Sequence, residues 1–329
     1  MPRVSVHQAQ EVADAALARA GVPADNAAVQ RDVLLEAELR GFASHGLLRL
    51  PRLIERIRNG VADPLATGAH QWRSHAFLSV DGERGLGPVV AMRALAAAGD
   101  RAKSQGVALA AISNSNHIGM LAYYAEHCVS LGQSVIALTT SEALVHPWGG
   151  RRAMIGTNPI AIGVPTGGEP FVMDTATSVV AMGRIHDHAN RGEPIPPDWA
   201  LDEEGNPTTD PERAKHGAIA PFGGAKGFAL GLAFELLVSS LTGAALGTGV
   251  RGTLDSTEVC NKGDVFIIID GPAGRLVDYL DAIRAEQPAA GFEAVRIPGE
   301  RGRASRRTTL ERGLSVADEV WNRIIDMAA

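Results

Sequence analysis

His117 lies in a segment whose residue types and spacing suit acid–base chemistry. The segment Asn114-Ser115-Asn116-His117-Ile118-Gly119 follows seven mostly apolar residues, 107–113, that are typical of a buried strand. Apolar side chains at helical spacing then predict a helix over residues 118–130. The carboxyl end of a strand beside a helix start is where open α/β sheets bind ligands. His117 could exchange a proton there near neutral pH, although a lone histidine in such a turn is more often a structural residue.

The segment Ser44-His45-Gly46-Leu47-Leu48-Arg49 is a second candidate for chemistry, at the turn into a helix predicted over residues 47–58. The spacing would let the His45 and Arg49 side chains point the same way. A sheltered guanidinium suits a planar carboxylate, which it can bind through two parallel hydrogen bonds. The alternative is a Ser44 helix cap and a solvated Arg49. No Gly-x-Ser-x-Gly motif or acidic partner favours a nucleophilic hydrolase.

Three other segments could bind phosphates and a pyridine ring. Gly156-Thr157-Asn158-Pro159 could form an anion-binding nest or a simple turn before a strand. Asp174-Thr175-Ala176-Thr177-Ser178 combines a carboxylate and hydroxyls at a strand end, which would also make a good helix cap. In the segment 221–227, flexible glycines and Lys226 open a helix, which favours a phosphate or ribose contact over a plain loop.

A glycine-rich turn between residues 81 and 91 superficially matches the dinucleotide fingerprint G-x-G-x-x-x-A. The next strand, however, ends in Ser113-Asn114, where a dinucleotide-binding Rossmann unit needs Asp or Glu for a ribose hydroxyl. Pro88 also alters the turn. The motif is therefore interpreted as a structural connection.

Composition narrows the class of protein. The 329 residues, 45% of them hydrophobic, are enough for a large core and about two subdomains. The net charge of −6 argues against nucleic-acid binding, despite a locally basic stretch between Arg301 and Arg312. Cys128 and Cys260 lie far apart, so we expect neither a disulfide framework nor a zinc site, and a reducing cytoplasm fits. We expect no signal peptide and no uncharged membrane-spanning run.

The elements that must position these residues fall into two kinds. The first seventy residues predict three helices, and the last forty-five return to helical patterning that should pack on them. Between them, short apolar strands alternate with helices, which is typical of an α/β layer structure. The strands are predicted at 76–80, 107–113, 134–139, 159–164, 170–174 and 265–269, and the helices at 88–104, 118–130 and 226–241. A polar, proline-rich stretch over 191–217 should cross the surface.

Taken together, the motifs resemble those of the malate/L-lactate dehydrogenase type 2 family. The matching segments are Ser44-His45-Gly46 with Leu48-Arg49-x-Pro51, Ser115-Asn116-His117-Ile118-Gly119, Pro147-Trp148-Gly149-Gly150, Gly156-Thr157-Asn158-Pro159-Ile160-Ala161, Asp174-x-Ala176-Thr177-Ser178, Ile195-Pro196-x-x-Trp199-Ala200-x-Asp202 and Pro221-x-Gly223-Gly224-x-Lys226-Gly227. These segments occur in the family's order, and the likeness extends from about residue 5 to residue 320. That family includes malate, sulfolactate and ureidoglycolate dehydrogenases and cyclic-imine reductases.

The resemblance implies roles for particular residues. His117 corresponds to the family's proton acceptor, and Ser44, His45 and Arg49 correspond to its substrate pocket. The residues implied in binding NAD or NADP are Ser141, Gly156, Thr157, Asn158, Pro159, Asp174, Ala176, Thr177, Ser178, Lys226 and Gly227. No metal is expected. His186 and His188 depart from the family's more aliphatic pattern, and their spacing of two puts them on different helix faces.

The resemblance also implies the fold and the activity. We expect a non-Rossmann α/β fold of the L-sulfolactate dehydrogenase-like type, with a three-layer mixed sheet over residues 75–282 and a helical domain built from residues 1–74 and 283–329. We expect hydride transfer between nicotinamide and C2 of a small 2-hydroxy or 2-oxo acid, in a cytoplasmic homodimer without nucleic-acid or membrane partners. The alternatives are an NAD(P)H-dependent reductase of a cyclic imino acid and a non-catalytic protein that senses a nucleotide.

Overall fold

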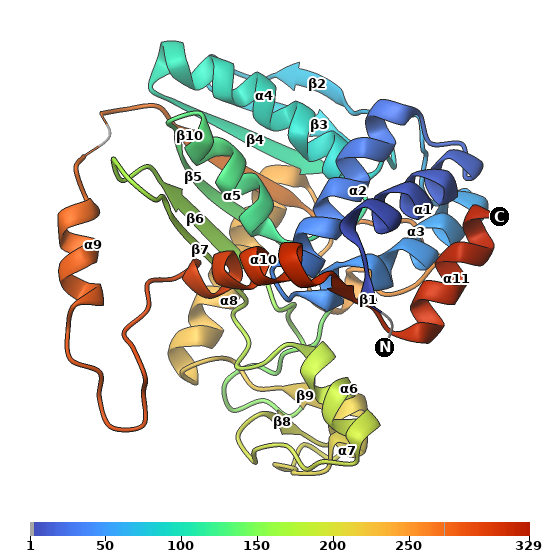
Figure 1. Ribbon diagram of the computed structural model, residues 1–329, viewed down its shortest axis with the longest axis vertical. Helices are drawn as coiled ribbons and strands as arrows, with labels where there is room; N and C mark the ends of the chain where they lie inside the picture. Colours follow the sequence, from blue (N-terminus) through green and yellow to red (C-terminus); the bar gives the residue numbers. More distant parts are fainter. Residues whose placement is uncertain (1–2, 273) are drawn as a thin grey trace.

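A mixed seven-stranded sheet forms the centre of the computed structural model, which describes residues 3–272 and 274–329 (Figure 1). In spatial order its strands are β2 (Ala69–Trp72), β3 (Phe77–Asp81), β4 (Val107–Ser113), β10 (Asp264–Ile269), β5 (Ser134–Thr139), β6 (Ile160–Val164) and β7 (Phe171–Thr175). Only β3 and β4 are parallel. All six predicted strands form. The edge strand β2 was missed because Ala-His-Gln-Trp lacks the alternation of apolar and polar residues.

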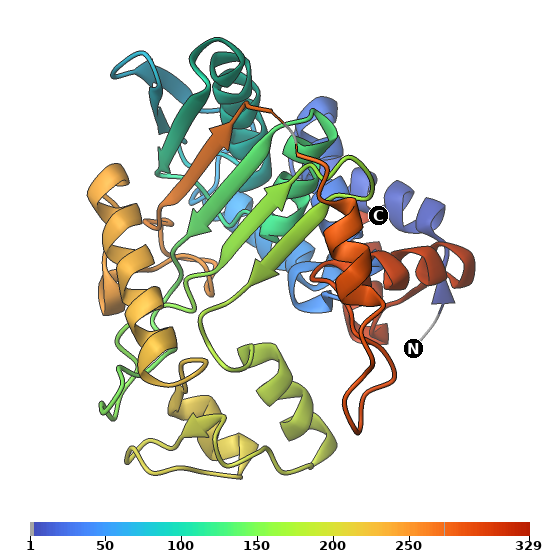
Figure 2. The ribbon, with the colours of Figure 1, turned by 90° about the vertical axis from the view of Figure 1, so that its left-hand side faces the viewer.

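Helices cover both faces of the sheet, which confirms the three-layer arrangement. Helices α4 (Gly87–Gln105) and α5 (Leu121–Ser130) pack on one face, and α8 (Ala225–Thr242) packs on the other (Figure 2). Successive side chains of β10 alternate between these layers, since Phe266 belongs to the α4–α5 core and Val265 to the α8 core.

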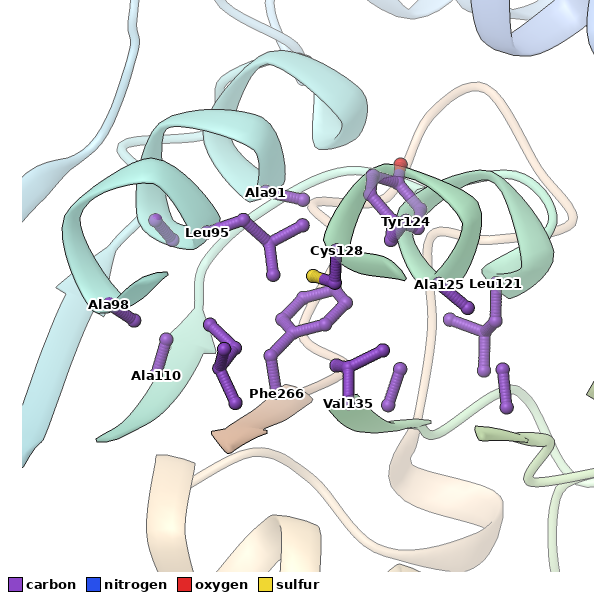
Figure 3. Packing of buried hydrophobic residues seen from close by; sticks show 14 of the residues in the cluster. Ala91, Leu95, Ala98, Ala110, Leu121, Tyr124, Ala125, Cys128, Val135 and Phe266 are labelled. Atoms are coloured by element: carbon purple, nitrogen blue, oxygen red, sulfur yellow. The ribbon is translucent and has the colours of Figure 1, made fainter. Parts of the chain in front are cut away.

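The main core lies between the sheet and the pair α4 and α5 (Figure 3). Phe266 rises from β10 and meets the Tyr124 ring edge-on, with ring centroids 5.5 Å apart. Alanines such as Ala98 on α4 and Ala110 on β4 fill the space between helix and strand. This close packing makes the end of β4, from which the His117 segment leaves, a rigid support.

Helices from the two ends of the chain form a separate group beside the three-layer structure, with a core of their own (Figure 1). They are α1 (Val6–Arg19), α2 (Ala24–Leu39), α3 (Leu50–Arg58), α10 (Glu300–Arg312) and α11 (Asp318–Ala328). Strands β1 (Arg3–Val4) and β11 (Leu314–Ser315) pair near the two termini. Within the last forty-five residues, α10 and α11 pack on the N-terminal helices as expected. Residues 285–299 are instead mostly exposed and irregular, and helix α9 (Val277–Arg284) precedes them. The exact domain boundaries remain predictions.

The predicted helix over residues 47–58 differs from the structure at its start. Two 3₁₀ turns, Ala43–His45 and Leu47–Arg49, precede α3. Pro51 lies in the first turn of α3. Its missing N–H costs no hydrogen bond at this position, but because Pro51 cannot donate to a preceding carbonyl, the regular helix does not continue toward the N-terminus. Ser44, His45 and Arg49 consequently lie on a compact turn rather than on a regular helix.

A small lobe extends from the sheet at the bottom of Figure 1. It contains α6 (Met182–Arg191), α7 (Pro211–His216) and the paired strands β8 (Ala200–Leu201) and β9 (Ala218–Ile219). The stretch 191–217, predicted to cross the surface, contains α7 and β8, which pack around a small core that includes Ile185 and Ile219. The lobe lies next to the candidate site, because a β-carbon on Gly183 of α6 would lie 3.3 Å from Ser44 Cβ.

Helix α8 is unusually exposed for its composition. Among the described residues it is the one helix long and apolar enough to cross a membrane, with 22% of its residues buried. The helix contains two charged residues, Lys226 and Glu235, and is therefore not an uncharged apolar run of membrane-spanning length. Leu230, Leu236 and Leu237 are each more than 40% exposed. Helix α8 therefore presents an apolar outer face.

Candidate active site

Two segments far apart in the sequence bring their candidate side chains together. The turn between α2 and α3 supplies His45, the connection from β4 to α5 supplies His117, and the two rings stack with centroids 5.7 Å apart at an angle of 26°. Ser44 Oγ lies 3.0 Å from His45 Nδ1. Arg49 Nε donates a 2.7 Å hydrogen bond to the Ser44 carbonyl. The structure thus joins all four residues predicted for substrate chemistry.

Three arginines line the adjoining pocket: Arg49 from the 3₁₀ turn before α3, and Arg52 and Arg56 from α3. Thr253 and His117 also line this pocket. Glu142 holds the Thr253 side of the pocket, since its Oε1 accepts hydrogen bonds from Thr253 N at 2.7 Å and Leu254 N at 2.8 Å. The pocket therefore carries positive charge suited to an anionic substrate.

Arg56 is a site residue that the sequence analysis missed. It is 5% exposed, and its Nε donates a 2.9 Å hydrogen bond to the Asn116 side chain, beside His117. Its Nη1 binds the Asp255 carbonyl at 2.9 Å, while the buried Nη2 has no partner among the described residues. An arginine at helical spacing gives no signal in the sequence that distinguishes this buried role from a solvated one.

Hydrogen bonds fix the backbone that carries His117. The Asn116 side-chain amide donates to the carbonyls of Arg84 at 2.7 Å and Gly85 at 2.9 Å. The neighbouring Gly87 approaches so closely that a β-carbon there would lie 2.3 Å from the Asn116 carbonyl oxygen. The glycine-rich turn at residues 81–91 therefore packs against the His117 segment, in agreement with its structural interpretation.

The His117 ring is itself oriented by backbone. Helix α5 begins at Leu121 rather than at residue 118, so His117 lies in an irregular connection. Within it, the Gly119 N–H donates a 3.1 Å hydrogen bond to His117 Nδ1. Gly119 has a φ of +74°, a conformation that glycine adopts without strain. The connection thus turns its own N–H onto the imidazole.

Both imidazoles are held in the neutral form at neutral pH. Burial, with the nearby positive charge of Arg49, lowers the pKa of His45 to about 4. Burial and the surrounding positive charges of Arg49 and Lys262 lower the pKa of His117 well below its usual value. A neutral imidazole can accept one proton and donate one hydrogen bond, which is the requirement for acid–base work.

Glu38 lies beneath the turn that carries His45 and Arg49. Its Oε1 accepts a 2.7 Å hydrogen bond from Leu47 N. A β-carbon on Gly46 would lie 2.3 Å from the same oxygen, so a larger residue there would displace the Glu38 carboxyl group. Burial raises the pKa of Glu38 to about 7. No sequence pattern indicates this contact, since Glu38 belongs to the preceding helix α2.

Several of the predicted cofactor residues form one hydrogen-bonded cluster. Thr157 N donates to Ser141 Oγ at 3.0 Å, and Thr177 Oγ1 donates to the Thr157 carbonyl at 2.9 Å. The fully buried Asn158 donates to Glu235 at 2.6 Å, and Gly156 N donates to the same carboxylate at 3.2 Å. The Gly156 N–H is therefore engaged within the protein rather than free for an anion, and the missed Glu235 organises this loop from α8.

The other predicted cofactor residues surround this cluster. Lys226 is exposed in the first turn of α8, with no partner among the described residues. A β-carbon on Gly227 would lie 1.9 Å from the Phe222 carbonyl, so Gly227 permits a close backbone crossing. Ser178 Oγ donates to the Val180 carbonyl at 2.8 Å. Ala176 and Pro159 are half-buried beside Thr177 and Asn158.

Asp174 does not cap a helix that follows its own strand but binds the first turn of α5. Its Oδ2 accepts a 2.7 Å hydrogen bond from Ala122 N, at the start of α5. Desolvation raises the pKa of Asp174 to about 6, although part of the side chain remains accessible to solvent. Asp174 thus ties the end of β7 to the helix that follows His117.

A buried ion pair lies between the two groups of residues. Lys262 binds Asp264, and both are almost fully buried. Thr139 Oγ1 also donates to Asp264 at 2.5 Å, two residues before Ser141. The carboxyl ends of β4 and β5 meet the start of β10 here, so this sheet edge connects the His117 segment with Ser141.

The described residues contain no cluster of three or more histidine, cysteine or acidic side chains that could bind a metal. His186 is exposed, and His188 Nδ1 lies 3.0 Å from the Pro194 carbonyl while its ring meets Trp199 edge-on. These two histidines belong to the small lobe and do not converge.

Comparisons with known proteins support one family. Residues 4–325 match the family model described as malate/L-lactate dehydrogenase. The chain is 37% identical to a (2R)-3-sulfolactate dehydrogenase (NADP(+)) from Chromohalobacter salexigens, covering 96% of each chain. It is 33% identical to Delta(1)-pyrroline-2-carboxylate reductase 1 from Burkholderia ambifaria, covering 98% of this chain and 97% of that protein. A solved dehydrogenase from Sinorhizobium meliloti superposes with a TM-score of 0.95 at 49% identity, covering 100% of this chain and 98% of that one.

Proposed function

This chain belongs to the malate/L-lactate dehydrogenase family. We propose that it oxidises or reduces a small 2-hydroxy or 2-oxo acid at the pocket lined by His117 and Arg49, with His45 stacked on His117. It is an NAD(P)-dependent oxidoreductase. The observation that carries the choice of site is the meeting of two imidazoles and a guanidinium, with the rings 5.7 Å apart and Arg49 bound to the carbonyl beside His45.

The residues around α8 fit a nicotinamide dinucleotide. Lys226 and the first N–H groups of α8 together provide a positive site for a pyrophosphate. Gly223 and Gly224 both have positive φ, which lets the backbone approach such a group closely. Ser141, Thr157 and Thr177 contribute hydroxyl groups nearby for a ribose or an amide. When bound, the dinucleotide accepts or supplies the hydride.

The chain's own residues would bind and orient the acid. Arg49 uses Nε to bind the Ser44 carbonyl, which leaves its two terminal nitrogens for the substrate carboxylate. The imidazoles of His45 and His117 would contact the oxygen on C2, and one of them would take or return its proton. The helices and the sheet supply alignment, which converts the reaction into an intramolecular event.

A cyclic imino acid is the alternative substrate. The same guanidinium would bind its carboxylate, and the proton would go to nitrogen rather than to oxygen. The similarity to a pyrroline-2-carboxylate reductase favours keeping this alternative open.

We also propose a cytoplasmic homodimer. The exposed leucines of α8 support burial against a second copy of the chain. Two free, buried cysteines suit a reducing compartment.

A substrate screen tests the proposed function. Purified protein is incubated with NADH or NADPH and with oxaloacetate, pyruvate, sulfopyruvate or a cyclic imine, and with the oxidised cofactors and ureidoglycolate. We expect turnover of a 2-oxo acid, followed as loss of reduced-nicotinamide absorbance. Turnover of the cyclic imine alone would establish the alternative, and no turnover with any compound would contradict an enzymatic role at this site.

A further inference from the structure

Trp148 belongs to the motif Pro147-Trp148-Gly149-Gly150, to which the proposed function assigns no role. All four tryptophans of the chain lie among the described residues, and Trp148 is the exposed one, with 62% of its surface accessible to solvent. An indole has a large apolar surface and usually buries most of it, either in the core or against a bound molecule. The exposed ring of Trp148 is therefore a candidate binding surface.

The exposed ring is nevertheless fixed in position. A β-carbon on Gly224 would lie 2.8 Å from Trp148 Cζ3 and 3.2 Å from Trp148 Cε3, so the six-membered part of the indole packs directly on the Gly224 backbone. The segment that carries Trp148 is held by the His146 N–H, which donates a 3.1 Å hydrogen bond to the Ile219 carbonyl. One part of the indole thus rests on the protein, while the rest remains open to solvent.

The turn on which the indole rests is the start of the proposed dinucleotide site. Gly224 immediately precedes helix α8, and its φ of +62° is a conformation that suits glycine. In the same turn, Phe222 N donates a 3.1 Å hydrogen bond to the Thr177 carbonyl. Lys226, in the first turn of α8, is exposed and has no partner in the described part of the chain. Trp148, Lys226 and Thr177 are therefore gathered around one short turn.

These groups match the parts of a dinucleotide. The first N–H groups of α8 and the Lys226 ammonium suit the pyrophosphate. The nicotinamide must lie beside the acid to exchange a hydride, which leaves the adenine as the flat ring available for a contact elsewhere. Aromatic side chains bind nucleobases by stacking, because every base has a π face. Trp148 offers an aromatic surface next to the proposed pyrophosphate site.

We propose that Trp148 stacks on the adenine base of the bound NAD or NADP, with the Gly224 backbone supporting the indole. The inference rests on the placement of the dinucleotide around α8 in the proposed function. It also gives the glycine at position 224 a second purpose, since a side chain there would displace the indole. A second copy of the chain is the alternative occupant of this surface, but the exposed ammonium of Lys226, two residues after Gly224, favours a phosphate-bearing ligand.

Isothermal titration calorimetry with ADP-ribose tests the contact, because this ligand contains the adenine and the pyrophosphate but no nicotinamide. We expect Trp148→Leu to raise the Kd for ADP-ribose by about 5- to 150-fold, the usual effect of losing one stacked base. Trp148→Phe should raise this Kd less, because phenylalanine keeps a smaller aromatic surface. Tyr279→Leu, at another exposed aromatic residue, is the control and should bind ADP-ribose as the wild type does.

Nicotinamide mononucleotide distinguishes stacking from a supporting role. This ligand lacks the adenosine, so its Kd should be the same for the wild type and Trp148→Leu. An equal loss of affinity for both ligands would show that the indole only supports the turn at Gly224, and would overturn the proposal. An unchanged Kd for ADP-ribose in Trp148→Leu would also overturn it, as would a wild type that binds NADH or NADPH but not ADP-ribose.

Tryptophan fluorescence reports the stacking itself. ADP-ribose does not absorb in the range of tryptophan emission, so quenching by this ligand indicates contact rather than energy transfer. We expect ADP-ribose to quench the wild type and to leave the emission of Trp148→Phe, which keeps the other three tryptophans, unchanged. Quenching that persists in Trp148→Phe would place the base at another residue.

Sedimentation velocity separates the two occupants of the Trp148 surface. Trp148→Leu should keep the oligomeric state of the wild type. A changed oligomeric state with an unaltered Kd for ADP-ribose would assign the indole to a subunit contact and refute the proposal. None of these measurements uses turnover, so a wild-type protein that turned over no acid would fail the proposed function, while the ADP-ribose titration would still decide the role of Trp148.

Discussion

Arg49 makes one contact within the protein and is proposed to make a second with the substrate carboxylate, and the single charged amine of a lysine could not make both. Its Nε holds the Ser44 carbonyl at 2.7 Å, which fixes the turn that bears His45. Its terminal nitrogens remain for a planar carboxylate. Guanidinium geometry is therefore as important here as positive charge.

The change Arg49→Lys should separate geometry from charge. We expect KM for the acid to rise by tenfold or more, because losing one charge-assisted hydrogen bond costs about 1.5 to 3 kcal/mol. Steady-state kinetics with the acid found in the screen would measure this effect. Arg58→Lys, an exposed arginine on the same helix α3, is the control and should leave KM unchanged. A KM in Arg49→Lys equal to that of the wild type would remove Arg49 from carboxylate binding.

At the scale of elements, helix α2 supports the catalytic turn through Glu38. The Leu47 N–H binds this carboxyl group, whose pKa burial raises to about 7 from an ordinary value of 4.5. The folded protein therefore holds the proton of Glu38 more tightly than the unfolded chain does. Between pH 4.5 and 7 the unfolded chain binds fewer protons, so this group makes the folded state less stable as pH rises.

The change Glu38→Gln should remove that dependence while its amide oxygen still accepts the Leu47 N–H. The difference in the free energy of unfolding between the variant and the wild type should shift in favour of the variant by on the order of 3 kcal/mol from pH 4.5 to pH 8, at about 1.4 kcal/mol per pKa unit. Urea unfolding at both pH values measures the difference. Glu203→Gln, at an exposed position, is the control. A difference between Glu38→Gln and wild type that does not vary with pH would contradict a raised pKa at Glu38.

The same elements show which parts of the molecule could be predicted from sequence. Periodic apolar residues located the six strands and the helices α4, α5 and α8 to within about three residues, because those patterns reflect burial in the core. The short residue pattern around His45 and His117 indicated chemistry because histidine and arginine are uncommon in buried turns. Their convergence depends on tertiary packing, which no local pattern encodes.

The residues that were missed share one physical property. They are charged side chains that point inward, from regular elements in the case of Glu38, Arg56, Glu235 and Asp264, and from the loop before β10 in the case of Lys262. In the sequence they look like the solvated face of a helix or the end of a strand. Their roles appear only when a backbone N–H or an opposite charge from a distant segment meets them.

At the scale of the whole molecule, the proposed homodimer involves the exposed face of α8. The inner side of α8 packs on β4, β5 and β10, and its outer side presents Leu230, 44% exposed, and Leu237, 42% exposed, seven residues apart and hence on one stripe. The first turn of the same helix carries Lys226, which belongs to the proposed cofactor site. Exposing an apolar stripe to water is unfavourable, and a second copy of the chain would bury it.

The double change Leu230→Glu and Leu237→Glu should disrupt this dimer. Burial of a leucine contributes about 1.5 to 3 kcal/mol, so two losses, with the added repulsion of charges across a twofold axis, should weaken association by at least about 10² to 10⁴-fold. Sedimentation velocity at micromolar concentration should then show a monomer where the wild type shows a dimer. Leu131→Glu, at an exposed leucine after α5, serves as the control and should stay dimeric. A dimer that survives the double change would place the subunit contact on another surface, whereas a monomeric wild type would refute the homodimer itself.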